Sequence, residues 1–538
     1  MKKYNNGYLG FALALMMIAT IPVRAQVYTE LHNFDWHKEG ANPNYPTLLA
    51  QGEDGNLYSS LQTQLSGEGS VFVSTLAGGL TELYGFTGDD GEFPQSGLSL
   101  GFDGNLYGTT EEGGKLRKGT VFKITPSGGM TVLYEFTDGA DGAYPWAPPI
   151  QAPDGSIYGV TNNGTNQGRV YRITPSGTFS GIAVAPSETT APLILGSDGN
   201  LYGTTLYGGA FNRGTVFQLT TKGKLKVIHS FDPSHESSGP TGPVMQGLDG
   251  KLYGTTVAGG TFDQGIVYQM TTSGGAFKIL YTFQGSAADG GHSTAGLVQG
   301  SDKFLYGVAT VGGANGLGTL FRISTTGKSF AVLHDFATQS GDTPYSTPVL
   351  HTNGIIYGTT NHGGSQFTGY GVLFSFDNGL KPFCSLVVIW SGKLGQQVGI
   401  LGQGFSQATG VQFGSGPGTF TVVSDTYMIA SPATNATTGP VTVLEPGGNL
   451  VSAQTFRVLP TILDFNPPSG SVGTQVTITG TSLLQTTGVS FTGAKATSFT
   501  VNSDSQVTVT VPAGARTGKI SITTKGGKAT STKKFTVN

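Results

Sequence analysis

The sequence repeats one pattern seven times: a tight turn, Leu-Tyr-Gly-Thr-Thr or a close variant, a Gly-Gly loop, and a segment similar to Gly-Thr-Val-Phe. Consecutive copies of its tyrosine lie 44 to 53 residues apart. A period of about fifty residues, made of short strands, is typical of a propeller or a similar array. The repeat therefore predicts an all-β fold in which each copy is one structural unit. The seven tyrosines are Tyr58, Tyr107, Tyr158, Tyr202, Tyr253, Tyr306 and Tyr357.

The second repeat shows how one unit is built. Strands are predicted at 98–100, 106–110, 119–125 and 131–136. Asp103-Gly104 joins the first two strands, because glycine accepts the positive φ that a tight hairpin turn requires. Four strands in about fifty residues make one propeller blade. Side chains alternate between the faces of a strand, so we interpret the tyrosine and the Val-Phe pair as packing between blades.

The two ends of the array complement each other. The seventh repeat has strand patterns at 355–360 and 371–376 but no fourth strand. The segment 27–34 resembles the fourth strand of the second repeat. Pairing this segment with the seventh unit would remove two exposed sheet edges. We therefore predict a seven-bladed β-propeller over residues 26–380, closed by the N-terminal strand 27–34.

The N-terminus has the features of a bacterial secretory signal over residues 1–25. Lys2 and Lys3 precede an apolar run at 10–21, and Val23-Arg24-Ala25 predicts cleavage before Gln26. The run is shorter than the roughly 20 residues that a membrane span needs. We expect a secreted or cell-surface protein with no membrane span after cleavage. The single cysteine, Cys384, excludes an internal disulfide.

The overall charge argues against some partners. The net charge is −3 and only 11% of the residues are charged. Neither value gives an electrostatic reason to bind nucleic acid or an anionic membrane surface. We expect no nucleic-acid partner.

The C-terminal third contains two similar segments, 384–458 and 459–538. Gln396 to Phe405 corresponds to Thr474 to Leu483, and alternating strands with frequent turns follow in both. Both segments resemble IPT/TIG immunoglobulin-like domains, the second over most of its length. The first diverges, with Trp390 in place of a proline-containing turn and an irregular stretch at 426–438. The resemblance implies two β-sandwiches after the propeller.

The seven repeats resemble the tandem GloVer repeat of exported bacterial proteins, which carry various C-terminal anchors. The motif LYGTT-x-x-GG-x-x-x-x-GTVF is nearly intact from Leu106, Leu201 and Leu252. This resemblance implies the architecture and export, and it implies no established chemistry.

The long, variable loops lie at one end of the predicted blades and hold the candidate ligand-binding residues. Binding residues concentrate on loops that a rigid scaffold carries. Aromatic side chains beside acids would suit stacking on sugar rings while the acids bond hydroxyl groups. The alternative is that these aromatic residues cover the blade ends and that the acids form turns. The candidates are Trp36, Tyr45, Asp89, Asp90, Phe93, Asp138, Asp141, Tyr144, Trp146 and Tyr345.

Three functional hypotheses follow. The first is a non-catalytic binding or adhesion protein whose partner is a polysaccharide or a surface protein, with the sandwiches as a spacer. The second is a polysaccharide hydrolase or lyase with paired loop carboxylates, which glycosidases hold roughly 5 to 10 Å apart. The third is a structural envelope or matrix component.

The sequence assigns no catalytic residue, metal ligand or cofactor. It contains no HExxH motif, no cysteine–histidine cluster and no nucleophile elbow. Calcium is the ion that the loop acids would suit best, although no segment has the spacing of a known calcium loop.

Overall fold

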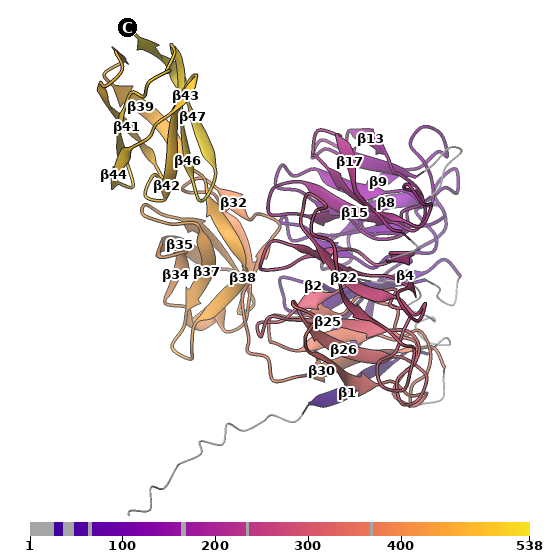
Figure 1. Cartoon of the computed structure of the whole chain (residues 1–538). Coiled ribbons are helices and arrows are strands. Elements are labelled where there is room, and N and C mark those ends of the chain that lie inside the picture. Colours follow the sequence, from indigo (N-terminus) through magenta and orange to yellow (C-terminus); the bar gives the residue numbers. More distant parts are fainter. Residues whose placement is uncertain (1–25, 36–47, 63–66, 163–167, 233–235, 366–368) are drawn as a thin grey trace, which may run out of the picture.

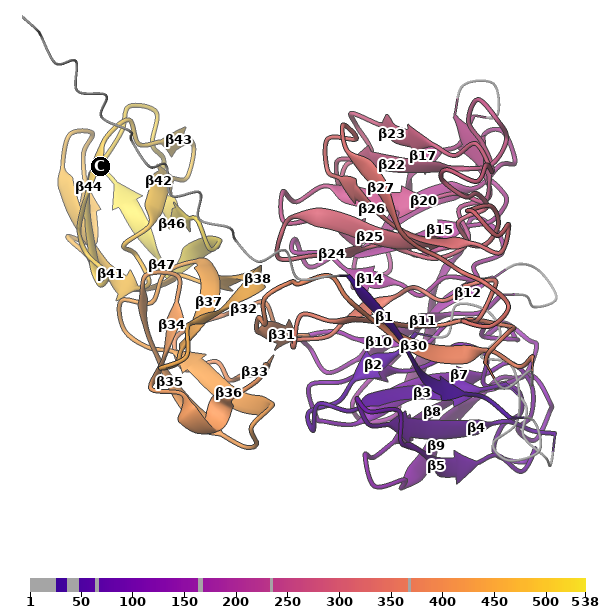
Figure 2. The same ribbon diagram turned by 90° about the horizontal axis from the view of Figure 1, so that it is seen from below.

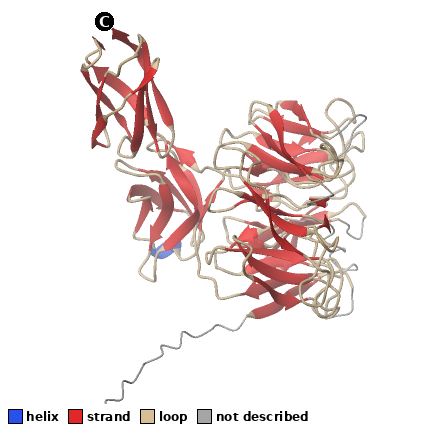
Figure 3. Cartoon of the chain, in the orientation of Figure 1, coloured by secondary structure: helices blue, strands red, loops and turns tan. Residues whose placement is uncertain are grey.

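The computed structural model describes residues 26–538, except 36–47, 63–66, 163–167, 233–235 and 366–368. Within these residues the only helix is the short 3-10 helix η1, Phe405–Gln407. Figures 1 and 3 show a large body of small sheets, followed by two smaller β-domains that lead away from it. The all-β class expected from the sequence is confirmed.

The large body contains seven four-stranded antiparallel sheets among the described residues. Sheets 1 and 2 are β2 (Ala50–Gln51), β3 (Leu57–Leu61), β4 (Ser70–Ser74), β5 (Leu80–Gly85), and β6 (Ser99–Leu100), β7 (Leu106–Thr110), β8 (Thr120–Ile124), β9 (Met130–Glu135). Sheets 3 and 4 are β10 (Ile150–Gln151), β11 (Ile157–Val160), β12 (Arg169–Ile173), β13 (Phe179–Val184), and β14 (Ile194–Leu195), β15 (Leu201–Thr205), β16 (Thr215–Leu219), β17 (Leu225–Ser230). Sheets 5 and 6 are β19 (Met245–Gln246), β20 (Leu252–Thr255), β22 (Ile266–Met270), β23 (Lys278–Thr282), and β24 (Val298–Gln299), β25 (Phe304–Ala309), β26 (Thr319–Ser324), β27 (Phe330–Asp335).

Sheet 7 combines the two ends of the array. It contains β28 (Val349–Leu350), β29 (Ile356–Thr359), β30 (Val372–Asp377) and β1 (Val27–Asn33). The N-terminal strand β1 pairs antiparallel with β30, from Val27 opposite Asp377 to Asn33 opposite Val372. Figure 2 shows β1 lying beside β30. A further two-stranded sheet, β18 (Ser237–Ser238) with β21 (Ala258–Gly259), joins loops of sheets 4 and 5.

In five of the seven sheets an aspartate of the tight turn bonds the repeat tyrosine. In sheet 1 Gly55 has a φ of 79°, and the Asp54 carboxylate accepts a bond from the Asn56 backbone N–H at 3.1 Å. The same carboxylate accepts the Tyr58 hydroxyl at 2.9 Å. Equivalent tyrosine–aspartate bonds of 2.7 to 2.8 Å occur in four other sheets. These pairs are Tyr107–Asp103, Tyr202–Asp198, Tyr253–Asp249 and Tyr306–Asp302.

The repeat tyrosines are packing residues, as the sequence indicated. All seven are at most 3% exposed. Burial, together with the bond to Asp198, raises the pKa of Tyr202 to about 12. Each therefore stays neutral and keeps its hydroxyl paired inside the protein.

Apolar clusters join every sheet to the next one. Tyr58 of sheet 1 packs with Leu106 and Phe122 of sheet 2, and corresponding clusters follow through to sheet 7. One cluster then joins sheet 7 back to sheet 1, with Tyr357 and Leu373 against Leu57 and Phe72. The apolar core of this body is therefore divided among the sheet interfaces.

The first small domain is one mixed sheet of eight strands in the order β31-β33-β36-β35-β34-β37-β38-β32. A β-sandwich, as expected from the sequence, has two separate sheets. Here β35 pairs with both β34 and β36, so the two layers are joined into one sheet. The stretch expected to be irregular contains the regular strand β36. The strands are β31 (Ser385–Val387), β32 (Ser391–Gly392), β33 (Val398–Leu401), β34 (Gly410–Phe413), β35 (Gly416–Val422), β36 (Tyr427–Pro432), β37 (Gly439–Leu444) and β38 (Leu450–Val458).

The second small domain has two sheets around a separate apolar core. One sheet contains β39 (Thr461–Asn466), β41 (Gln475–Thr481), β44 (Phe499–Ser503) and β45 (Gln506–Thr510). The other contains β40 (Ser469–Gly470), β42 (Thr486–Phe491), β43 (Ala494–Lys495), β46 (Gly518–Thr524) and β47 (Lys528–Val537). We call the two small domains sandwich 1 and sandwich 2.

Sandwich 1 is docked against the seven-sheet body. The Thr426 hydroxyl donates to the Glu53 carbonyl at 2.6 Å, and the Arg457 guanidinium donates to the Ser197 carbonyl at 2.6 Å. Apolar contacts join Val387 and Tyr427 to Leu100 of sheet 2. Sandwich 1 is thus held against several sheets, whereas Figure 1 shows sandwich 2 leading away from the body.

Candidate functional site

The seven sheets have two distinct ends. The Asp-Gly-type turn of each sheet and, in sheets 1 to 6, the turn between the third and fourth strands lie at one end, which we call the tight-turn face. The second-to-third-strand loop and the connection to the next sheet lie at the other end, which we call the long-loop face. Eight of the ten candidate residues lie on the long-loop face, and the other two, Trp36 and Tyr45, fall outside the described residues.

Asp90 and Asp141 fold their own loops. Asp90 accepts the Thr87 backbone N–H at 2.9 Å and also accepts the Tyr84 hydroxyl. Asp141 holds the equivalent place in the next repeat and accepts the Thr137 N–H at 2.8 Å and hydroxyl at 2.6 Å. Its carboxylate also accepts the Tyr134 hydroxyl at 3.1 Å. The two carboxylates are thus positioned by separate loops and do not form a catalytic pair with each other.

The pKa of Asp141 shows that these bonds hold the charged form. Burial by itself would raise this pKa, but the bonds from Thr137, Gly139 and Tyr134 outweigh it and lower the pKa below its usual range. Asp289 in sheet 5 repeats the arrangement, with Gln284 N–H at 2.7 Å and the Tyr281 hydroxyl at 3.2 Å. A carboxylate with this many internal donors stabilises a loop.

Lys118 joins two of the candidate residues, and sequence reasoning had not selected it. Its ammonium group lies 3.0 Å from the Asp138 carboxylate and donates to the Tyr144 hydroxyl at 2.8 Å. The same group is 5.0 Å from the centre of the Tyr144 ring. The bonds to Tyr144 and Asp138 raise the pKa of Lys118, so its ammonium group stays charged and forms an ion pair with Asp138.

Trp146 belongs to a second cluster, around Glu111. The Glu111 carboxylate interacts with the Trp146 indole and accepts a bond from the Gln95 amide. Burial raises the pKa of Glu111, and the bonds from Trp146 and Gln95 only partly oppose that effect. Gln95 and Trp146 occupy equivalent positions in consecutive repeats, each directly after a proline. Glu111 is therefore a carboxyl group of altered acidity that the sequence analysis missed.

Phe93, Tyr345 and Asp89 lie apart from these clusters, and the backbones of Phe93 and Tyr144 share one feature. Phe93 and Tyr144 have φ values of 58° and 55°, and the backbone of each connects two loops. Tyr345 is half-buried, and its carbonyl accepts the Thr294 hydroxyl at 3.4 Å. Asp89 is exposed. The structure thus brings together Asp138 with Tyr144, and Trp146 with Glu111.

Exposed aromatic residues occur elsewhere on the long-loop face. Tyr207, Phe211 and Phe262 are 49%, 51% and 52% exposed. Phe211 and Phe262 hold the same position in the Gly-Gly loops of sheets 4 and 5. The sequence signal was available, because both are aromatic residues at a variable position of the motif, but a loop position alone does not reveal exposure.

Hydrogen bonds to backbone N–H groups hold the tips of these two loops. The Asn212 side chain accepts the Gly208 N–H at 2.9 Å, and Asp263 accepts the Gly259 N–H at 2.7 Å. Between the tips, the Gly239 N–H donates to the Arg213 carbonyl at 3.2 Å, and the Gly239 carbonyl accepts the Val257 N–H at 3.0 Å. One connecting segment thus ties both loops together, and the exposed rings are carried by neighbouring, hydrogen-bonded loops.

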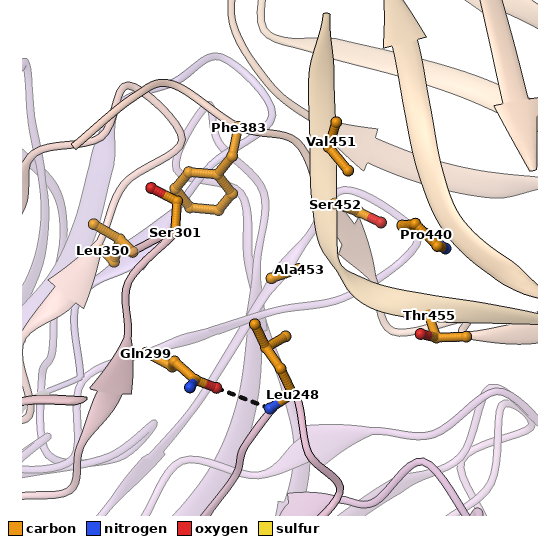
Figure 4. Close-up of a pocket in the computed structure, with 10 residues that line it drawn as sticks. All are labelled: Leu248, Gln299, Ser301, Leu350, Phe383, Pro440, Val451, Ser452, Ala453 and Thr455. Carbon is orange, nitrogen blue, oxygen red and sulfur yellow. Dashed lines mark hydrogen bonds between the residues drawn. The ribbon is translucent and has the colours of Figure 1, made fainter. Parts of the chain in front are cut away.

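Cavities occur where sandwich 1 meets the tight-turn face. Figure 4 shows one of about 320 Å³, in which Leu350 and Phe383 face Pro440 and Val451 of the sandwich. The Leu248 N–H at its edge donates to the Gln299 side-chain oxygen at 2.8 Å. A second cavity of about 410 Å³ lies among the innermost strands.

Two observations bear on metals and membranes. Within the described part of the chain, no group of three or more histidine, cysteine or acidic residues is arranged to hold a metal ion. Among the same residues, no helix is long and apolar enough to cross a membrane.

Tandem four-stranded sheets with docked β-domains define an all-β repeat protein. The profile of the Gloeobacter/Verrucomicrobia repeat matches residues 17–190 and 187–420, and the IPT/TIG domain profile matches residues 460–537. The chain belongs to the Gloeobacter/Verrucomicrobia repeat family and carries a C-terminal IPT/TIG domain. The resemblance of the seven repeats to this family is thereby confirmed, and the IPT/TIG resemblance is confirmed for the second small domain, whereas for residues 384–458 it stays a prediction. Comparison with curated protein sequences finds no match.

Solved structures provide similarity at the level of the fold. A gluconolactonase from Xanthomonas campestris is 13% identical, with a TM-score of 0.36, over 66% of this chain and 90% of its own. A fungal alcohol oxidase of the AA5 family in complex with copper is 13% identical, with a TM-score of 0.42, over 92% and 98%. A surface glycan-binding protein from Prevotella bryantii is 14% identical, with a TM-score of 0.23, over 28% and 38%.

Proposed function

We propose that the seven sheets are blades of one closed β-propeller and that residues 26–380 form this domain. The successive apolar clusters support the ring, because the last of them joins sheet 7 to sheet 1. The pairing of β1 with β30 supports it as well, since it covers an edge that would otherwise stay open. In this proposal sandwich 1 covers residues 384–458 and sandwich 2 residues 459–538.

The function that the geometry supports best is non-catalytic binding of a polysaccharide at a cell surface or outside the cell. The observation that carries this proposal is the exposure of Tyr207, Phe211 and Phe262 on two neighbouring, hydrogen-bonded loops. Large exposed apolar side chains gathered in one place mark interaction sites. An aromatic ring covers the apolar face of a sugar, and the exposed Arg213 beside these rings offers donors to hydroxyl groups.

The Lys118 and Glu111 clusters extend the proposed binding face across sheets 2 and 3. Tyr144 and Trp146 supply aromatic surface there, and Lys118, Asp138 and Glu111 supply polar groups. Residues 1–25 have the pattern of a secretory signal, which supports an extracellular location. Sandwich 2, which leads away from the body, would separate the binding face from an attachment point.

A polysaccharide hydrolase or lyase is the second candidate. Glu111 favours it, because a buried carboxyl group with a raised pKa can act as a general acid. Asp90, Asp141 and Asp289 offer less support for catalysis, since each is bonded to donors of its own loop.

The test is a polysaccharide binding screen with the chain 26–538, with each ligand also checked for new reducing ends. The double variant Phe211→Ala/Phe262→Ala is expected to bind at least tenfold more weakly, which is about 1.4 kcal/mol. Leu463→Ala is the control, because Leu463 is 67% exposed in sandwich 2, away from the long-loop face. All three side chains are exposed, so melting temperatures should hardly change.

The outcomes separate the two candidates. Binding without turnover, lost in the double variant and kept in Leu463→Ala, supports the binding protein. Turnover that disappears in Glu111→Gln while binding remains would support the hydrolase or lyase instead of the binding protein. No bound polysaccharide, or equal binding by the double variant and its control, would overturn the proposal.

A further inference from the structure

A cavity of about 410 Å³ lies at the centre of the seven-sheet body. Every sheet contributes lining residues from its first strand or from the residues just before it. Most of the lining is aliphatic, and a volume of several hundred Å³ is typical of sites for small molecules, which span roughly 300 to 1,000 Å³. The aliphatic lining includes Leu48, Leu100, Ile150, Ile194, Met245 and Leu297.

Apart from the Trp390 indole N–H, the polar side chains of the lining are already bonded within the protein. The Gln151 side-chain oxygen accepts the Phe102 N–H at 2.9 Å, and the Gln246 side-chain oxygen accepts the Ser197 N–H at 2.7 Å. The Thr347 hydroxyl oxygen accepts the Gly296 N–H at 2.8 Å, and the Ser99 hydroxyl donates to the Pro149 carbonyl. A buried water needs two to four polar partners, so this cavity holds water poorly and favours an apolar occupant.

Sandwich 1 places two side chains in the lining, Val388 and Trp390. They come from the short turn between β31 and β32, in which the Ile389 N–H donates to the Val387 carbonyl at 2.5 Å. Val388 there has a φ of 57°. A β-branched residue rarely adopts this left-handed conformation, and such strain is found mainly at functional sites. The docked sandwich thus holds a strained turn against the cavity.

Trp390 adds a second unusual feature. Its indole N–H is buried and has no hydrogen-bond acceptor among the described residues. A buried donor without a partner is rare in native proteins, and an unfilled site beside it is one explanation. Trp390 also lines the adjoining cavity between sandwich 1 and sheet 5, so its ring lies between two open spaces.

We propose that the central cavity binds a small, largely apolar molecule and that Val388 and Trp390 of sandwich 1 close the site on the tight-turn face. The apolar lining selects the chemical class of the ligand, and the shape of the closed site limits its size. This site lies among the first strands of the sheets, whereas the proposed glycan surface is formed by loops of the long-loop face, and the inference does not depend on that proposal.

The probe for the test is N-phenyl-1-naphthylamine, whose fluorescence rises when it enters an apolar site. The chain 26–538 is expected to bind it saturably with one-to-one stoichiometry. Ile194→Phe and Met245→Phe fill the cavity, and each should weaken binding at least tenfold. Leu248→Phe is the matched control, because Leu248 lines the neighbouring cavity of Figure 4 and is 49% exposed. The control should change the affinity of the probe by less than about twofold.

Energy transfer from tryptophan provides a second readout that does not depend on the filled variants folding. Of the two tryptophans that the structure describes, Trp146 and Trp390, only Trp390 lines the cavity. Trp390→Phe should remove more of the transferred emission than Trp146→Phe does, while the affinity of the probe is retained.

Two results would overturn the proposal. The first is the absence of saturable one-to-one binding. The second is equal binding by the filled variants and Leu248→Phe together with equal energy transfer in Trp390→Phe and Trp146→Phe.

Discussion

Gln51 and Thr352 lie 301 residues apart in the chain and exchange two hydrogen bonds across the junction of sheets 1 and 7. The Gln51 amide nitrogen donates to the Thr352 hydroxyl at 2.8 Å, and the Thr352 N–H donates to the Gln51 side-chain oxygen at 3.0 Å. Glutamines of sheets 3, 5 and 6 make the corresponding bond to the turn of the preceding sheet. The junction between the two ends of the array is thus bonded like an internal one.

Gln51→Leu is therefore expected to weaken the junction. Leucine is already present at the equivalent positions Leu100, Leu195 and Leu350, so the strand itself should tolerate it. The loss leaves the buried Thr352 N–H without its acceptor, which costs about 1 to 3 kcal/mol of unfolding free energy. Denaturant unfolding measures this cost. Gln246→Leu, at a more exposed junction, should cost less, and an equal cost in both variants would contradict this reasoning.

Deleting residues 26–34 should destabilise the seven-sheet body as a whole. β30 would lose its partner β1, and Phe34 would leave the cluster that joins sheets 7 and 1. The expected result is a fall in melting temperature of at least several degrees. In domains of about 150 to 250 residues, a loss of 1 kcal/mol shifts the midpoint by about 2 to 4 °C. The chain beginning at Gln26 is the reference. An unchanged melting temperature would show that the strand contributes nothing to the closure.

Stability should fall with acid through His351. This residue is fully buried, its Nε2 lies 3.0 Å from the Gly55 carbonyl of sheet 1, and burial lowers its pKa. Below pH about 6.5 the unfolded chain binds a proton that the folded protein does not, so the stabilisation present above that pH is lost as the pH falls. The slope from one such group reaches at most about 1.4 kcal/mol per pH unit.

His351→Gln should reduce this slope between about pH 7 and 5, as measured by unfolding at a series of pH values. A smaller slope will remain, because burial also lowers the pKa of His334. His362→Gln is the control, since the His362 side chain is 55% exposed. A slope unchanged by His351→Gln, or reduced equally by the control, would assign the acid sensitivity to other groups.

Asp141→Asn should loosen the loop at 137–142 and lower the stability of the protein. The carboxylate accepts backbone and hydroxyl donors that the neutral amide binds less strongly, at a cost of about 1 to 3 kcal/mol. Because the folded pKa of Asp141 is lowered, its contribution is present above the unfolded value of about 3.9 and is lost as the pH falls below it. Thermal unfolding at pH 7 and at acid pH tests both points. The exposed Asp89→Asn should change stability by less than about 0.5 kcal/mol, and a comparable loss there would argue against the loop-folding role of Asp141.

The candidate site was only partly predictable from the sequence. The Asp-Gly turns and the strand at Leu106–Thr110 were found where local patterns placed them, because both depend on residues a few positions apart. Lys118 and Glu111 were missed, since their partners Tyr144 and Trp146 lie 26 and 35 residues further along the chain. Phe211 and Phe262 were missed for a different reason. Their exposure depends on what neighbouring loops leave uncovered, and a sequence pattern does not report that.

By itself, the sequence determined the repeat, the alternation of buried and exposed side chains, the turns and the family. These features follow from residue types at short spacing, where backbone geometry limits the outcomes. Only the tertiary structure decided which loop acids are used to fold their own loops, how Gln51 meets Thr352, and where sandwich 1 docks. Those outcomes depend on packing and hydrogen bonds between residues up to several hundred positions apart. The central cavity beneath Trp390 is of this kind, because it exists only where seven sheets and a separate domain meet.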